Sequence, residues 1–204
     1  MANINLGDIK RIVFDGDKEI TMPQGGGGVE FDAEARVAGD VVLPDHVTRI
    51  GDYAFYGFTS LMSIEIPQGV KRIGNHAFRE CTSLMSIEIP QGVTTIATFA
   101  FNGCTSLTSI VIPQGVTIID SSAFRSCRGL RHVEIGEGIT YFATNSYTFR
   151  DCVSLESVIL PDSCASVGNN TFLDANPGFT LSVKEGTNVS MTGMPADVNI
   201  VYRP

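Results

Sequence analysis

Apolar residues return at fixed intervals along most of this chain, and equivalent positions lie 23 residues apart. The segment SIEIPQGV occupies positions 63–70 and recurs unchanged at 86–93, and SIVIPQGV follows at 109–116. Within the unit 66–88 the recurring apolar positions are Ile66, Val70, Ile73, Ala77, Phe78, Cys81, Leu84 and Ile87. A fixed period in the twenties is typical of a solenoid, in which no repeat can bury its apolar face alone.

Each unit contains three local patterns. The segment Leu84–Ile89 alternates apolar and polar residues and predicts a short strand with one face inward. Pro67 and Gly69 predict a turn, since Pro fixes its φ and Gly tolerates positive φ. Residues 77–81 (AFREC) carry apolar side chains at spacings that fit one turn of α-helix or 3₁₀-helix. One unit is therefore one coil, and stacked coils form a parallel sheet with strands ~4.8 Å apart.

The units begin at residues 43, 66, 89, 112, 135 and 160, which predicts a right-handed solenoid of about six coils. Three phenylalanines follow an alanine at the same coil position and should stack in one buried column: Phe78, Phe101 and Phe124. The unit 135–159 carries two extra residues before its phenylalanine, and the unit 160–183 departs most from the pattern. We expect the regularity of the coils to decrease there.

The two ends of the chain differ from the repeats. Residues 9–22 are two β-prone runs around Asp15 and Gly16, which predict a β-hairpin within an N-terminal segment 1–24. Four glycines at 25–28 predict a flexible linker. The solenoid then covers 29–183, with a cap strand in 29–42, and residues 184–204 form a β cap over its last apolar edge.

The repeat pattern, written IPxGVxxIgxxAFxxCtsLxxIx, resembles the BspA-like class of bacterial leucine-rich repeats over roughly residues 37–183. This resemblance implies a leucine-rich-repeat solenoid of short parallel strands joined by turns or 3₁₀ segments. It also implies a surface or secreted protein, of bacteria or of some protists, that takes part in adhesion and binds host proteins. The chain departs from the pattern at 135–139, where IGEGI replaces IPQGV, and at Ala175, which replaces the column cysteine.

The first residues of the chain support an alternative setting. The segment INLGDIKRIVFDGDKEI (4–20) is similar to hairpins that open some bacteriophage tail and other virion proteins. In that setting the hairpin docks to the particle and the solenoid faces outward. The N-terminus has no basic region followed by an apolar run, so no signal peptide is visible. Either the protein is made without such a signal, or the sequence begins after a removed one.

Composition and charge narrow the classes of partner. Of the 204 residues, 43% are hydrophobic and 18% are charged, as in folded proteins. The net charge of −8 and the scattered Lys and Arg residues argue against binding to nucleic acid phosphates. No run of about eighteen apolar residues is present, so the sequence predicts no membrane span. The pattern leaves the oligomeric state open.

The five cysteines predict a buried column. Cys81, Cys104 and Cys127 recur every 23 residues, and Cys152 keeps the same column once the insertion is counted. Side chains of one column lie parallel, whereas a disulfide needs two Cβ vectors that point toward each other. The chain also lacks the C-x₂-C pair of a zinc site. We expect these thiols to be inert core residues, and Cys164 to lie in another core column.

The sequence predicts no enzyme, no cofactor and no metal site. His46, His76 and His132 fall in three different columns. Ser157 and Glu134 could neighbour His132 across adjacent strands, as a catalytic triad requires, but similar Ser and Glu residues recur in other coils. The glycine run 25–28 lacks the following Lys-Ser/Thr of a phosphate-binding loop. These polar residues are therefore interpreted as surface positions.

The remaining candidate site is the outward face of the strands. Residues that flank a buried Ile or Val point to solvent. The predicted binding face consists of Ser63, Glu65, Ser86, Glu88, Ser109, Val111, Arg131, His132, Glu134 and Ser157. It is either an ordinary solvated sheet face or a flat recognition strip for a protein or cell-surface partner. The strip lacks Trp and Tyr, so carbohydrate stacking is not expected on it. The function predicted is a non-enzymatic binding or adhesion module outside the cell.

Overall fold

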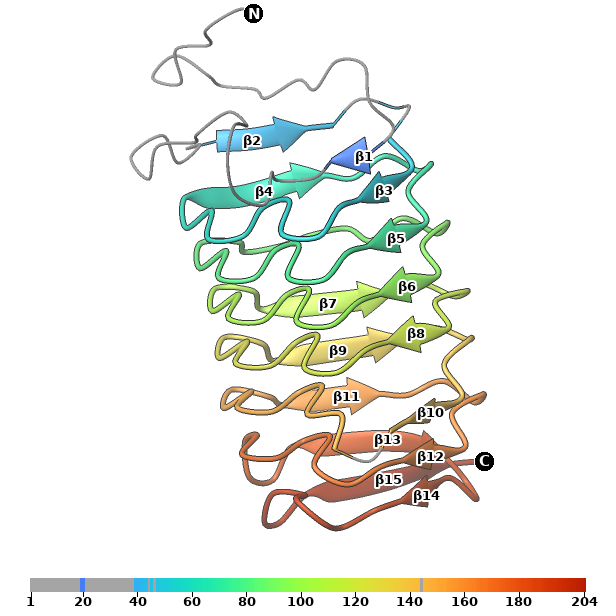
Figure 1. Ribbon diagram of the computed structural model, residues 1–204. Helices are drawn as coiled ribbons and strands as arrows, with labels where there is room; N and C mark the ends of the chain where they lie inside the picture. Colours follow the sequence, from blue (N-terminus) through green and yellow to red (C-terminus); the bar gives the residue numbers. More distant parts are fainter. Residues whose placement is uncertain (1–18, 21–38, 44, 46, 144) are drawn as a thin grey trace, which may run out of the picture.

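The computed structural model describes residues 19–20, 39–43, 45, 47–143 and 145–204. In these residues the chain winds into a parallel β-solenoid of about seven turns, which confirms the leucine-rich-repeat architecture with one turn more than the six predicted (Figure 1). Every strand pair in this part of the chain is parallel. The described residues contain no helix of the length and hydrophobicity that a membrane crossing requires.

The longer strands lie along one side of the coils and form two sheets. One sheet pairs β2 (Gly39–Val42) with β4 (Leu61–Glu65). The other contains β7 (Ser109–Ile112), β9 (His132–Ile135), β11 (Ser157–Ile159), β13 (Thr180–Lys184) and β15 (Asn199–Arg203). Their register places equivalent residues of successive coils side by side, as Ser157 lies beside His132. Each coil therefore contributes the same outward positions to one face.

Two-residue strands form a second set of sheets (Figure 1). The first contains β1 (Glu19–Ile20), β3 (Arg49–Ile50), β5 (Arg72–Ile73), β6 (Thr95–Ile96) and β8 (Ile118–Ile119). The second contains β10 (Tyr141–Phe142), β12 (Ser166–Val167) and β14 (Asn188–Val189). The break between β8 and β10 lies next to the two extra residues of the coil 135–159, where the sequence predicted lower regularity.

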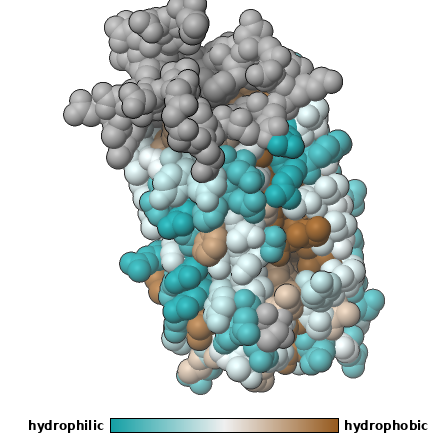
Figure 2. Space-filling model, in the orientation of Figure 1, coloured by the Kyte–Doolittle hydropathy of each residue, from teal (hydrophilic) through white to brown (hydrophobic). Residues whose placement is uncertain are grey.

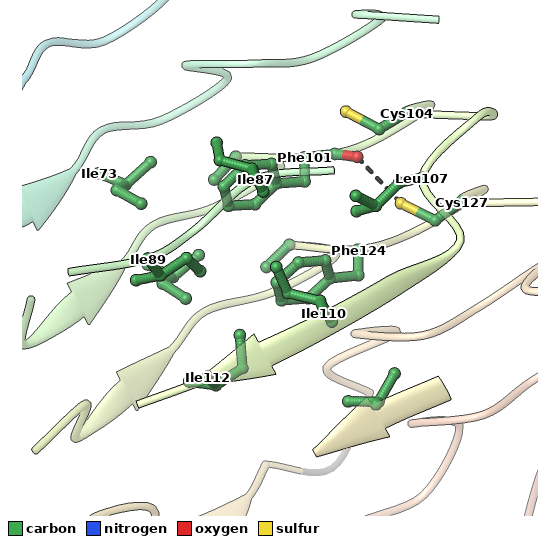
Figure 3. Close-up of a cluster of buried hydrophobic side chains, with 14 of the residues drawn as sticks. Ile73, Ile87, Ile89, Phe101, Cys104, Leu107, Ile110, Ile112, Phe124 and Cys127 are labelled. Carbon is green, nitrogen blue, oxygen red and sulfur yellow. Dashed lines mark hydrogen bonds between the residues drawn. The ribbon is translucent and has the colours of Figure 1, made fainter. Parts of the chain in front are cut away.

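A column of stacked phenylalanines fills the interior. Phe55, Phe78, Phe101, Phe124, Phe149 and Phe172 are all fully buried, and each belongs to a successive coil. Neighbouring ring centroids are 5.1 to 5.6 Å apart, with interplanar angles of 3° to 9°. The spacing is close to that of parallel strands, so one ring per coil suffices to fill the core. The predicted phenylalanine column is confirmed, and Figure 3 shows Phe101 above Phe124.

The cysteines form a second buried column. All five are buried with free thiols. In the repeat column, each thiol donates a hydrogen bond to the carbonyl oxygen of the stacked phenylalanine one coil earlier, with Sγ···O distances of 3.0 to 3.3 Å. Figure 3 shows this bond from Cys127 to Phe101. The predicted ladder is confirmed, and the thiol has a second use that the sequence did not indicate: it satisfies a buried carbonyl group.

The segment after each short strand is a series of turns, so the helical alternatives predicted for 77–81 are wrong. His76 and Glu80 have φ angles of 55° and 62°, which interrupt any right-handed helix. The N–H groups of His76, Phe78 and Glu80 donate to carbonyl oxygens of the following coil. The alternate N–H groups close turns onto carbonyls three residues earlier. Successive N–H groups thus alternate between the following coil and their own turn, whereas in a continuous helix every N–H bonds within the helix.

The predicted strand Leu84–Ile89 is not formed, although its neighbours in adjacent coils are β4 and β7. Its side chains keep the predicted alternation: Leu84, Ile87 and Ile89 are buried, and Glu88 is exposed. The segment is nearly identical to β4, so the two coils bring Glu65 and Glu88 to the lining of one hollow. Like charges on neighbouring strands oppose close pairing, and the interruption on the β4 side lies at these two glutamates.

The structure describes the C-terminal end of the chain but only a few residues near its N-terminal end. Most of the predicted hairpin 9–22, the glycine linker and the segment 29–38 lie outside the described residues. Glu19 and Ile20, which are described, pair in parallel with β3. Residues 184–204, predicted as a cap, wind as one further coil, because β14 pairs with β12 and β15 pairs with β13.

Candidate functional site

The residues of the predicted binding face lie on the outer side of the long strands or of the aligned segment 84–89, except Arg131, which directly precedes β9. Ser63 and Ser157 are half-buried and the other eight are exposed. The alternation within β9 shows why: His132 and Glu134 face outward, while Val133 and Ile135 are in the core. The geometry therefore places these ten side chains on one continuous face, which we call the strand face.

The N-terminal part of the strand face contains a hollow between β4 and residues 86–88. Its volume is about 310 Å³. Ser63, Glu65, Gln68, Ser86 and Glu88 provide its polar lining, and the backbone and side chains of Ile64, Ile66 and Ile87 complete it. The hollow thus joins four of the predicted residues at the interruption of the sheet. We call it the acidic hollow, because its charged residues are both glutamates.

The C-terminal part of the strand face contains a cluster of opposite charges. The Arg131 guanidinium forms an ion pair with the Glu156 carboxylate. His132 Nδ1 lies 2.9 Å from Ser157 Oγ, and His132 Nε2 lies 3.7 Å from the same Glu156 carboxylate. These four residues form the mixed-charge cluster. The sequence allowed Ser157 and His132 to be neighbours, and the register of β9 and β11 brings them together.

The acidic partner in this cluster is Glu156, which the sequence did not pair with His132. Glu134 was the acid considered for His132, but its neighbours in register are Val111 and Ile159. Glu156 precedes β11 and lies beside Arg131, whose carbonyl accepts its backbone N–H. The arginine at the equivalent position of the preceding coil was the available signal, because Arg and Glu in one column of adjacent coils form a cross-strand pair.

The Ser157–His132–Glu156 arrangement has the residue types of a catalytic triad, but it lies on an open, solvent-exposed sheet face. The side chains of His132 and Glu156 are 58% and 46% exposed. Catalytic hydrogen bonds gain their strength in water-excluded sites where donors await a developing charge. On an open sheet face, solvent screens these contacts. The cluster can instead offer a donor, an acceptor and both charge signs to an approaching partner.

Exposed apolar side chains lie among the polar groups of the strand face. Met62, Met85, Val111 and Ile159 are all exposed, and each lies on or beside a long strand or the aligned segment. Methionine adapts its shape to a partner and is enriched in protein interfaces. The face therefore combines adaptable apolar contacts with charged groups, as protein-binding surfaces do. In the described ranges, no three His, Cys, Asp or Glu side chains cluster in a way that could hold a metal ion.

Comparison with protein families identifies the repeats. The BspA type leucine rich repeat region matches in six copies, over residues 37–152 and 143–187. No curated protein matches the chain.

Solved structures show the same architecture. A leucine rich repeat protein of T. pallidum (TpLRR) is 33% identical with a TM-score of 0.59, over 71% of this chain and 72% of that one. A leucine-rich repeat protein from Bacteroides ovatus is 24% identical with a TM-score of 0.56, over 86% of this chain and 58% of that one. The pneumococcal vaccine antigen PcpA has a TM-score of 0.65 at 19% identity, over 85% of this chain and 43% of its own.

Proposed function

Because this chain belongs to the BspA-type leucine-rich-repeat family, we propose that it is an adhesion module that binds a protein partner through its strand face. The family consists of bacterial surface-type proteins, and its repeats generally serve as non-enzymatic scaffolds that mediate protein interactions. The proposal adds to this the surface display of this chain and the face that makes the contact.

The observation that carries the proposal is the juxtaposition on one face of the acidic hollow, the mixed-charge cluster and exposed apolar side chains on or beside the same strands. Protein interfaces combine a desolvated apolar centre with charged groups that orient the partner. The charge of this face differs between its two ends along the solenoid axis: Glu65 and Glu88 lie at one end, and the Arg131–Glu156 ion pair lies at the other. A partner with basic groups opposite the acidic hollow would bind in one direction only.

Extracellular display is supported by the family, which consists of bacterial surface-type proteins, and by the vaccine antigen PcpA among the similar structures. The virion setting rests on residues 4–20, and all but two of these lie outside the described part of the chain. The strand face serves either setting, since it requires only that the solenoid be accessible to a partner.

The test is a charge reversal on the strand face. The double variant Glu88→Lys/Glu134→Lys should fold almost normally, because exposed substitutions change stability by less than about 0.5 kcal/mol. It should associate more slowly with host-cell or bacterial surfaces, and the dependence of its binding on ionic strength should change. Binding of the wild type and the variant is measured at two ionic strengths.

The matched control reverses two exposed turn residues, Asp45→Lys and Glu185→Lys, and so changes the net charge by the same amount. Loss of binding in the strand-face variant alone supports the proposal. Equal binding by the wild type and the strand-face variant contradicts it. An equal loss in both variants would indicate an effect of net charge and would also contradict a specific strand-face site.

A further inference from the structure

The sheet of two-residue strands opens between β8 and β10, and a hollow occupies the opening. Its volume is about 350 Å³, and it is lined by residues 117–121 on one side and by Tyr141, Ala143, Asn145 and Ser146 on the other. The two extra residues of the coil 135–159 precede Phe149, so the longer coil and the opening of the sheet coincide in this region. Figure 2 shows hydrophobic surface at the level of β8.

Tyr141 borders a second hollow as well. This one has a volume of about 590 Å³ and extends across β10, β12 and β14, with Ser166, Asn169, Asn188 and Ser190 as polar lining. Tyr141 and Ala143 are common to both hollows. The two together span four neighbouring coils, a length of roughly 14 Å at ~4.8 Å per strand. We call this combined surface the Tyr141 groove.

Tyr141 is the most exposed aromatic residue in the described part of the chain. Its side chain is 64% accessible, and Ile118 at the equivalent position of the preceding coil is 49% accessible. The half-buried Tyr53 and Tyr147, by contrast, contact a neighbouring ring or a guanidinium group. A solvated ring beside a groove can stack on a flat apolar surface while its hydroxyl remains hydrogen-bonded.

The polar lining has a definite chemical character. No Lys, Arg or His is among the described residues that line either hollow, and Asp120 is the one charged group among them. A phosphate, sulfate or carboxylate ligand would meet no cation there. The Asn145 and Asn169 amide oxygens accept hydrogen bonds from Asn170 and Ser190 within the protein. The asparagine amide groups add N–H donors to the lining, and the serine hydroxyls can donate and accept. The lining therefore matches a neutral ligand with many hydroxyl groups and one apolar face.

We propose that the Tyr141 groove binds a neutral oligosaccharide, with a sugar ring stacked on Tyr141 and its hydroxyls bonded to the Asp120, Asn145, Asn169 and Asn188 side of the groove. A pyranose ring has a C–H face that suits aromatic stacking and hydroxyl edges that suit carboxylate and amide groups. The groove is long enough for more than one sugar unit. It is lined by residues separate from those of the strand face, so the two sites can be occupied independently.

The experiment is a glycan-binding assay with the full chain. The probes are immobilised neutral tri- and tetrasaccharides built from glucose, mannose, galactose or N-acetylglucosamine, together with sialylated and sulfated forms of the same glycans. The wild type should bind a subset of the neutral probes. The Tyr141→Ala variant should bind them roughly ten-fold more weakly, as expected for the loss of one stacked ring, whereas Tyr141→Phe should retain binding.

The control is Tyr202→Ala, because Tyr202 on β15 is also an exposed tyrosine, at 56%, and lies outside both hollows. The strand-face variant Glu88→Lys/Glu134→Lys should keep glycan binding even where it loses its protein partner, which separates this inference from the proposed function. Absence of binding to every neutral probe at millimolar concentration overturns the inference. So does equal binding by Tyr141→Ala, or a preference for the sialylated or sulfated probes.

Discussion

The interior of the solenoid and its outer sheets respond differently to irregularity. The phenylalanine column continues through six successive coils without a gap. In the described residues, by contrast, the long-strand sheet is interrupted between β4 and β7, and the short-strand sheet between β8 and β10. Both interruptions lie beside hollows that we assign to binding.

The insertion shows which contacts keep the coils in register. Across it, Phe124 and Phe149 remain stacked at 5.6 Å, and Cys152 still donates to the Phe124 carbonyl at 3.3 Å. The β8–β10 pairing is lost instead. Burial of a phenylalanine contributes several kcal/mol, whereas one backbone hydrogen bond contributes about 1 kcal/mol net. The core therefore sets the register of the coils, and strand pairing is lost where two neighbouring coils differ in length.

The largest predicted difference between interior and surface is the protection of the central thiols from chemical labelling. Burial raises the pKa of Cys81 to about 12, and burial also raises the pKa of Cys104 well above its usual value. Thiolate is the reactive form, so Cys104 should react with a thiol reagent only when its coils unfold. Relative to the unfolded protein, its labelling rate should be lower by the factor that corresponds to the free energy of unfolding, on the order of 5 kcal/mol or more. Mass spectrometry of labelled peptides measures it.

Reductant should leave the melting temperature unchanged, since the cysteines are free. Rapid labelling of Cys104 without denaturant, at the rate of an unfolded control, would contradict a continuous interior.

The next effect is the loss of one ring from the column. Phe101→Ala should lower the free energy of unfolding by ~3–5 kcal/mol, because it removes buried apolar area and leaves a cavity between Phe78 and Phe124. Met85→Ala, at an exposed position, should change it by less than about 0.5 kcal/mol. Denaturant titration of both variants measures the difference. A loss below about 1 kcal/mol for Phe101→Ala would mean that the column does not hold the coils together.

The contrast between core and surface also explains what could be predicted. The 23-residue period predicts the burial of Phe101 and Cys104 and the outward position of Glu88, because a repeated side chain must occupy a repeated environment. The positive φ of His76 does not follow, since bulky residues rarely adopt it and only the pairing between coils imposes it. The position of the insertion near the hollow beside Tyr141 was visible in the sequence. The sequence did not indicate which strand pairing would be lost, because that depends on the relative stability of the core contacts and of each sheet.

One part of the turn geometry did have a signal in the sequence. The second positive-φ position of each coil is Gly57, Glu80, Gly103, Ser126, Asp151 or Asp174. This column holds glycine and polar residues in otherwise repetitive units, which is typical of left-handed backbone.

A smaller effect tests the turns that link the two sheets. Gly103 has φ of 75°, and an added Cβ would meet Glu80 Cγ only at an ordinary contact of 3.5 Å. Gly103→Ala should therefore lower the free energy of unfolding by about 1–2 kcal/mol through backbone strain alone. Gly103→Asn should cost less, because Asn tolerates the left-handed region. Equal losses in thermal or denaturant unfolding would indicate a steric cause instead.

The smallest effect concerns the interruption of the long-strand sheet. Glu65 and Glu88 line the same acidic hollow from adjacent coils. If their repulsion keeps the segment 84–89 from pairing with β4, Glu88→Gln should raise the free energy of unfolding, by at most about 0.5 kcal/mol for exposed charges. The gain should shrink at high salt, where the repulsion is already screened. Amide hydrogen exchange of Ser86 to Glu88 should slow as the hydrogen bonds form.

Glu134→Gln is the matched control for this change. Glu134 occupies the same outward column as Glu88, but its neighbours in register are the uncharged Val111 and Ile159. Its neutralisation removes no cross-strand repulsion, so neither its stability nor its amide exchange should change. A stabilisation of both variants by the same amount would trace the gain to net charge. Unchanged exchange in Glu88→Gln would mean that something other than the two glutamates holds the sheet open, and that the acidic hollow persists without its charge.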